Sequence, residues 1–199
     1  MSTIPFEEGR FYHIFNRGNN KEDIFIEEKN YFFFLQKIKQ HLLPTCNIYA
    51  YCLMPNHFHL VLQIKELKEL PEVYKTGKKK LHQPFSNLFN AYTKSINIAY
   101  DRTGSLFQEH LHRNLIESEE YLKDAIIYTL LNPVNHGFTS NYQTYPYSSI
   151  LSVLSHQPTD IKRNEIKDLF GAIENLIYCL DRRKFLNEEK LKEIEENDI

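Results

Sequence analysis

Residues 54–64 read MPNHFHLVLQI, a short apolar segment that follows a Pro-Asn turn signal and carries two histidines. Side chains of a β-strand alternate between the two faces of its sheet. One predicted face is wholly apolar and holds Phe58, Leu60, Leu62 and Ile64. The other face holds His57, His59, Val61 and Gln63. The segment therefore predicts a strand with a core on one side and two neighbouring imidazoles on the other.

Two neutral imidazoles on one face of a strand can bind a cation if a third group approaches from elsewhere in the chain. The chain contains nine histidines, so a pair at this spacing also arises by chance. The alternative is a half-exposed strand with two ordinary polar residues. A metal site therefore requires a third ligand from another segment.

The composition is that of an ordinary globular protein. The chain has 199 residues, of which 42% are hydrophobic, enough for one domain with a sizeable core. No apolar run has the length of a membrane span, and the first residues lack the features of a signal peptide, so we expect a cytoplasmic protein without membrane contact. The three cysteines form no CxxC pair, which argues against a disulfide framework or a thiolate zinc site.

The formal net charge of −2 does not by itself favour a nucleic-acid partner. The charge is unevenly distributed, because residues 65–113 carry nine basic and five acidic side chains. Lys78, Lys79 and Lys80 are consecutive within that region. Such a patch can attract phosphates, although a solvated lysine-rich loop explains it equally well.

The remaining segments predict three further strands and two helices. We expect strands at 10–17, 46–53 and 106–116, amphipathic helices at 27–43 and 85–104, and a mobile charged loop at 65–80. This order is typical of an α+β, ferredoxin-like (RRM-like) fold, a four-stranded antiparallel sheet with two helices on one face. The face that bears the histidines is then free to receive a ligand or another helix.

Another helix is predicted directly after the fourth strand. Ser118 is suited to cap its N-terminus, and Pro133 disfavours helical geometry at Asn132, so the helix is expected to end close to Pro133. Tyr128 and Asn132 are four residues apart and share a face at its C-terminal end. This pair could supply the group that the histidine site lacks.

An asparagine oxygen suits a hard divalent cation, and a tyrosine one turn earlier could hold its phenol near whatever the cation binds. Asparagine before proline also frequently ends a helix, and Tyr128 could simply pack on the sheet. Tyr121, seven residues earlier, is the competing nucleophile. Its partner one turn later is Ala125, which cannot bind a cation.

With these residues in view, the chain resembles the HUH single-strand DNA transposases with one catalytic tyrosine, and most closely the REP-associated tyrosine transposases. The matching segments are YHIFNRGNNKEDIF from Tyr12, MPNHFHLVL from Met54, GSLFQ from Gly104, YTLLNPVNHGF from Tyr128 and YPYSS from Tyr145. They occur in the order of the family. Here the histidines precede the tyrosine, which distinguishes the chain from relaxases of the HUH type.

The resemblance implies a ferredoxin-like catalytic domain in which His57, His59 and Asn132 bind Mg²⁺ or Mn²⁺. Tyr128 would attack a phosphodiester of single-stranded DNA, leaving a 5′-phosphotyrosine and a free 3′-hydroxyl. The substrate would be recognised through a hairpin beside the cleavage site. Relatives include dimers, so the resemblance also allows a homodimer.

The expected domain organisation is a catalytic domain at 1–150 and a helical C-terminal extension at 151–199. Candidate DNA contacts are Arg17, Asn19, Lys78, Lys79, Lys80 and Arg113. Glu109 and His110 stand where many relatives carry basic residues, which weakens the expected DNA contacts of the fourth strand.

Two other function classes remain open at this point. A non-catalytic module would bind single strands by aromatic stacking on the open sheet face, without need of divalent metal. A histidine-based zinc hydrolase would require another His, Cys or acidic ligand near the pair, and the sequence has neither an HExxH nor a CxxC pattern.

Overall fold

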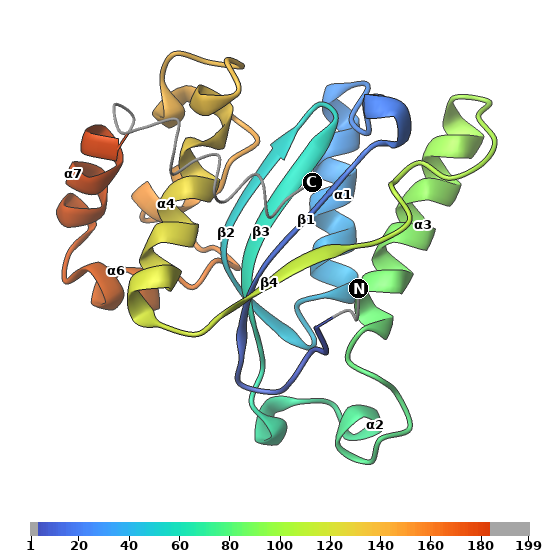
Figure 1. The fold of residues 1–199 in the computed structure, drawn as a ribbon, viewed down its shortest axis with the longest axis horizontal. Helices are drawn as coiled ribbons and strands as arrows, with labels where there is room; N and C mark the ends of the chain where they lie inside the picture. The colour runs from blue at the N-terminus through green and yellow to red at the C-terminus, as the bar shows by residue number, and fades with distance from the viewer. Residues whose placement is uncertain (1–3, 184–199) are drawn as a thin grey trace.

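A computed structural model describes residues 4–183 and contains a four-stranded antiparallel sheet in the order β2-β3-β1-β4 (Figure 1). The strands are β1 (Phe11–Arg17), β2 (Cys46–Met54), β3 (His57–Ile64) and β4 (His112–Ile116). Strand β1 pairs with β3 and β4, and β2 pairs with β3. The predicted ferredoxin-like α+β fold is confirmed.

Helices cover both faces of this sheet. Figure 1 shows α1 (Glu28–His41) and α3 (Gln83–Ala99) on one side of the strands and α4 (Glu119–Asn135) on the other. Helix α1 begins at a capping box, in which the side chains of Glu27 and Asn30 each accept a hydrogen bond from the other residue's backbone N–H. Helix α4 begins at Ser118, whose side chain accepts from the Tyr121 N–H. The extra helix therefore occupies the face that the sequence left free.

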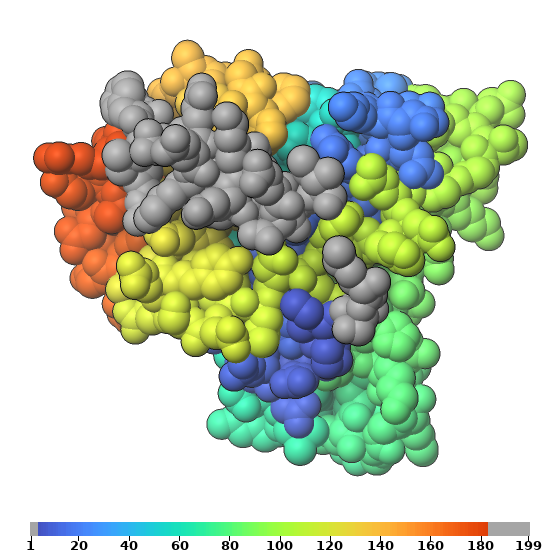
Figure 2. All heavy atoms as spheres, viewed as in Figure 1, coloured from blue at the N-terminus to red at the C-terminus, as the bar shows by residue number. Residues whose placement is uncertain are grey.

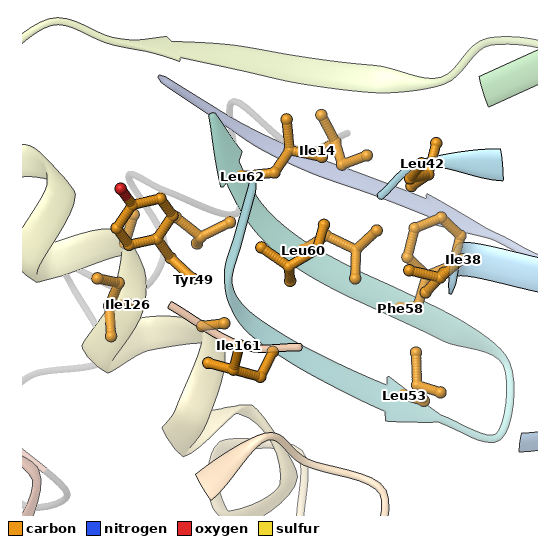
Figure 3. Close-up of a cluster of buried hydrophobic side chains, with 14 of the residues drawn as sticks. Ile14, Ile38, Leu42, Tyr49, Leu53, Phe58, Leu60, Leu62, Ile126 and Ile161 are labelled. Carbon is orange, nitrogen blue, oxygen red and sulfur yellow. The ribbon is translucent and has the colours of Figure 1, made fainter. Parts of the chain in front are cut away.

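The predicted alternation of β3 agrees with its burial. Phe58 and Leu60 are fully buried, and Figure 3 shows them with Ile38 of α1 inside the hydrophobic cluster. The histidine face is buried too, because α4 packs against β2 and β3; Val61 is fully buried and His59 is 4% exposed. Burial on both faces removes the open surface that a sheet with helices on one side would present.

Three predicted segments differ in extent from the structure. The loop at 65–80 contains short helices η2 (Leu67–Glu69) and α2 (Glu72–Lys75), and α3 ends at Ala99 rather than near Gly104. Strand β4 is shorter than the predicted 106–116. Phe107 makes only an isolated bridge to Gly18, and regular pairing with β1 begins again at His112. Apolar content around 107 predicted a strand, but after the Gln108 N–H, which donates to the Arg17 carbonyl (2.9 Å), strand pairing with β1 is interrupted until His112.

The third long helix ends close to Pro133, as expected, but Asn132 and the proline itself lie inside it. Helix α4 passes through Pro133 and ends at Asn135. Proline removes one donor, so only the bond to the carbonyl four residues earlier is lost. The next turn still closes, because the His136 N–H donates to the Asn132 carbonyl (2.9 Å) and the Phe138 N–H donates to the Pro133 carbonyl (2.8 Å).

The chain after α4 returns to the sheet edge at β2. The segment contains η3 (Tyr142–Thr144), α5 (Ile150–Leu154), α6 (Arg163–Phe170) and α7 (Ile173–Arg183). Its buried residues, including Ile161 and Leu180, join the same hydrophobic cluster as the sheet. The described part of the predicted 151–199 extension is thus helical and shares the main core; residues 184–199 lie outside the described residues. No helix of the described part is long and apolar enough to span a membrane.

Candidate active site

His57 and His59 lie on the sheet face beneath α4. His57 is directly opposite Arg17 of β1, and His59 is opposite Phe15. The two histidine rings are 5.4 Å apart and nearly perpendicular. The pairing register therefore places Arg17, one of the candidate DNA contacts, on the same face as both histidines.

Helix α4 brings the predicted tyrosine and asparagine to this face. The Tyr128 ring meets the His59 ring edge-on at 5.6 Å between centroids and the His13 ring at 5.8 Å. Asn132 lies one turn later and donates from Nδ2 to the Tyr128 carbonyl at 3.2 Å. Both side chains are buried, at 5% exposure for Tyr128 and 0% for Asn132. The structure thus places Tyr128 against the histidines, and Asn132 on the same stretch of α4.

Three buried polar atoms of β3 and α4 have no hydrogen-bond partner among the described residues: His57 Nε2, Asn132 Oδ1 and the Thr129 hydroxyl. The first two belong to side chains that the sequence predicted as ligands. The side-chain oxygen of Asn56 lies 2.6 Å from His57 Nδ1 and can only accept, so His57 Nδ1 carries the proton and Nε2 presents a lone pair. Buried polar atoms are nearly always paired, and an orphaned pair of acceptors fits a divalent cation.

Burial keeps the imidazoles neutral. It lowers the pKa of His57 to about 3, assisted by His136 and Arg17, and lowers the pKa of His13 to about 4. The pKa of His59 lies well below its ordinary value, first because of burial and then because of the neighbouring histidines. Neutral imidazole is the form that binds metal, so the site is in its ligand form at pH 7.

Sequence reasoning missed two histidines that the fold adds to the site. His13 of β1 lies with its Nε2 3.1 Å from His59 Nδ1. His136, which follows α4, has its ring 4.8 Å from the His57 ring. His136 is four residues after Asn132, a spacing that would have indicated it, but the helix was expected to end close to Pro133. His13 lies inside the matching segment that begins at Tyr12, but that segment did not indicate its contact with His59, because the contact depends on the register between β1 and β3.

The competing tyrosine lies farther back on α4. Tyr121 is half-buried beside the hydrophobic cluster, and Ala125 one turn later is buried. Seven residues of helix correspond to about 10 Å along its axis. Tyr121 and Tyr128 therefore lie on one helix about 10 Å apart, and Tyr128 is the one whose ring contacts the histidine rings.

The other candidate DNA contacts are dispersed. Asn19 donates from its side chain to the Ser105 carbonyl (3.2 Å), which gives it a structural bond. Arg113 pairs in register with Ile14 on the opposite sheet face, and its guanidinium lies 4.4 Å from the Phe6 ring centre.

The lysine cluster lies at the far end of the molecule. Lys78, Lys79 and Lys80 are exposed and follow α2. Figures 1 and 2 show this green segment at the opposite end of the sheet from the β2–β3 turn, where His57 begins β3. The structure does not bring these lysines together with the histidines.

The YPYSS segment has a structural role at the sheet edge. The Tyr145 hydroxyl donates to the Leu53 carbonyl at 2.9 Å, and the Leu53 N–H donates to the Tyr147 carbonyl at 3.0 Å. Ser149 continues this contact by donating its N–H to the Tyr51 carbonyl at 2.9 Å. Covering the edge of β2 satisfies its backbone and holds the segment after α4 against the strand that precedes the histidines.

The two alternative functions find less support in this geometry. A stacking module needs exposed rings on the histidine face, but Phe15 there is 6% exposed beneath neighbouring rings. Within residues 4–183, no group of three or more His, Cys, Asp or Glu side chains is arranged to hold a metal ion. A three-ligand site at the histidine pair therefore depends on the Asn132 oxygen.

The fold and the sequence together are similar to those of single-tyrosine DNA transposases, the class that the motifs indicated. A Haemophilus influenzae protein named as a REP-associated tyrosine transposase is 25% identical over 123 residues, which cover 58% of this chain and 68% of that protein. The solved structure of a REP-associated tyrosine transposase bound to a REP hairpin matches with a TM-score of 0.58 at 15% identity, over 80% of this chain and 88% of that one.

No family model matches the chain. The curated relative confirms the resemblance to REP-associated tyrosine transposases in sequence, and the solved structure shows that the fold is shared.

Proposed function

We propose that this protein cleaves and rejoins single-stranded DNA beside hairpin sequences, with Tyr128 as the nucleophile. The observation that carries the proposal is the pair of orphaned buried acceptors, His57 Nε2 and Asn132 Oδ1, in a region where the Tyr128 ring contacts His59. A buried histidine cluster of this kind has no structural need of unpaired acceptors, since each costs about 1–3 kcal/mol when unsatisfied. Binding of a cation by these atoms would remove that cost.

The ligand set would be His57 Nε2, a nitrogen of His59 and Asn132 Oδ1. A bound Mg²⁺ or Mn²⁺ would neutralise charge on the scissile phosphate and orient the phosphorus for attack. Asn56 fixes the His57 tautomer, and the buried turn of α4 holds Tyr128 and Asn132 in fixed relative positions. Arg17, opposite His57, is available to contact the DNA backbone.

In the proposed reaction the Tyr128 oxygen forms a bond to phosphorus while the bond from phosphorus to the 3′-oxygen breaks. The phenolic proton leaves to solvent, and the departing 3′-oxygen takes up a proton to become a hydroxyl. A free phenol with a pKa near ~10 is a weak nucleophile at pH 7, so placement beside a cation site is required. The phosphotyrosine conserves the phosphodiester energy, and the reverse reaction rejoins the strand without ATP.

The proposed substrate is a single strand that carries a hairpin. This proposal is supported by the structural neighbour, which was solved with a REP hairpin bound. A single strand at the cleaved bond suits this site better than a duplex, because α4 covers the sheet and the tyrosine is buried. A flexible strand can enter such a site more readily than a duplex.

The test is covalent trapping. The protein is incubated with Mn²⁺ and a single-stranded oligonucleotide that carries a hairpin and a fluorescent label on the strand 3′ of the break, and adducts are resolved on a denaturing gel. We expect a labelled adduct with the wild type and with Tyr121→Phe, and none with Tyr128→Phe. Binding of the uncleaved hairpin should be the same for all three proteins.

Two outcomes would overturn the assignment. An adduct of equal yield with Tyr128→Phe would reject Tyr128 as the nucleophile. Hairpin binding that ignores Mn²⁺ and survives His57→Ala, with no adduct from any substrate, would instead support the non-catalytic binding module.

A further inference from the structure

We infer that His13 is a positioning residue that holds His59 in the tautomer able to bind a cation. The inference rests on the proposed function, because it assigns a role toward the same metal site. His13 Nε2 and His59 Nδ1 face each other at 3.1 Å, and the rings are within 18° of parallel. The two residues are 1% and 4% exposed, so solvent does not compete for this contact.

The contact can exist in two forms. If His13 donates from Nε2, His59 Nδ1 accepts, and the single proton of a neutral His59 must then be on Nε2. If His59 donates from Nδ1, His59 Nε2 carries a free lone pair. Only the second form presents a metal-binding atom on the side of the ring away from His13.

The structure gives His57 a related arrangement, with a partner that can only accept. Asn56 Oδ1 accepts from His57 Nδ1 at 2.6 Å, which leaves the orphaned Nε2 as the ligand atom. Metal-binding histidines usually donate their other ring N–H to an acceptor that fixes the ring and its tautomer. His13 occupies that position for His59, in place of the more usual carboxylate or carbonyl.

The position of His13 explains why it serves this purpose. It pairs with Val61 in the β1–β3 register and is therefore a diagonal neighbour of His59 on the same sheet face. Its ring also meets the Tyr128 ring at 5.8 Å. One buried imidazole thus touches both a proposed ligand and the proposed nucleophile, so its loss should change the geometry of the site without removing a ligand.

The experiment measures binding of Mn²⁺ alone, by calorimetry and by electron paramagnetic resonance. His13→Leu removes the acceptor and should weaken Mn²⁺ binding by about 10–100-fold. His13→Gln, whose amide oxygen can accept from His59 Nδ1, should remain within about threefold of the wild type. His112→Leu is the matched control, because His112 stacks on Phe15 on the same face and should leave Mn²⁺ binding unchanged.

A second readout reports the tautomer directly. Long-range ¹H–¹⁵N spectra of the metal-free protein should show the His59 proton on Nδ1 in the wild type and in His13→Gln. His13→Leu should shift His59 toward the Nε2–H form, an effect that a purely structural role would not produce. This readout also covers the case in which His13→Leu folds poorly, because the wild type and His13→Gln suffice to assign the tautomer.

The outcomes separate this inference from the proposed function. Loss of Mn²⁺ binding with His57→Ala but wild-type binding with His13→Leu would overturn the role of His13 alone. His59 found with its proton on Nε2 in the wild type would do the same. A wild type that binds no Mn²⁺ would overturn both proposals.

Discussion

Acidification should destabilise the metal-free protein through its buried histidines. His13 and His57 have pKa values of about 4 and about 3 in the fold, against about 6.5 in an unfolded chain. The unfolded state therefore binds more protons below pH 6.5, and stability falls as pH falls. The contribution of the neutral rings is complete above about pH 6.5 and is lost progressively as pH drops toward the folded-state pKa values.

The size of this loss follows from the shifts. Each histidine lowers the free energy of unfolding by up to about 1.4 kcal/mol per pH unit between its unfolded and folded pKa values. This amounts to about 2 kcal/mol between pH 7 and pH 5. His13 and His57 together should remove about 4 kcal/mol, out of a total stability of about 5–15 kcal/mol for a typical domain. His59, whose pKa is also lowered by burial, acts in the same direction.

The assay is urea unfolding of the metal-free protein at several pH values from 7.5 to 5. His13→Gln removes one titrating ring, so its stability should fall by about 2 kcal/mol less than that of the wild type over the same range. A wild type that loses less than about 1 kcal/mol between pH 7 and pH 5 would refute the reasoning. Such a result would mean that the buried rings accept protons within the fold, and that the site is not held in its neutral ligand form.

Three further changes test other parts of the structure. Tyr145→Phe removes the hydroxyl that donates to the Leu53 carbonyl and should cost about 1–2 kcal/mol by urea unfolding, whereas an unchanged midpoint would show that the edge contact is dispensable. Gly18→Ala would place a Cβ in collision with the Glu22 carbonyl oxygen and should lower stability by about 1–3 kcal/mol in thermal unfolding; a neutral effect would contradict this close approach. Asn132→Ala should abolish the stabilisation that saturating Mn²⁺ gives the wild type, about 2.7 kcal/mol at 100 times the dissociation constant, and a retained thermal shift would remove Asn132 from the ligand set.

Much of the fold could be predicted because its signals are local. The alternation in 57–64 and the helical spacing in 27–43 each depend only on neighbouring residues, and both agree with the burial and the elements of the structure. Errors occurred where a local rule competes with a tertiary contact. Pro133 predicted non-helical geometry at Asn132, but packing of α4 on the sheet and closure of the following turn outweigh the loss of one hydrogen bond.

The residues of the candidate site also fall into two groups, those that local sequence signals could indicate and those that depend on tertiary contacts. His57, His59, Tyr128 and Asn132 could be selected from spacing and motif, because each pair lies within one element. The contact of His13 with the site, and the placement of Arg17 and Arg113 on opposite sheet faces, could not be predicted from the sequence. Moving a strand by one residue transfers every side chain to the other face, so these assignments depend on how β1 pairs with β3 and β4.

The order of residues along the chain was sufficient to predict the four strands and three long helices, the apolar face of β3 and the four side chains proposed for chemistry. Only the folded chain decided that α4 lies over those histidines, that His13 contacts His59 and that the lysine cluster lies at the far end of the sheet. The physical reason is range: periodicity and capping act within a few residues, whereas register and helix docking depend on contacts between segments far apart in sequence.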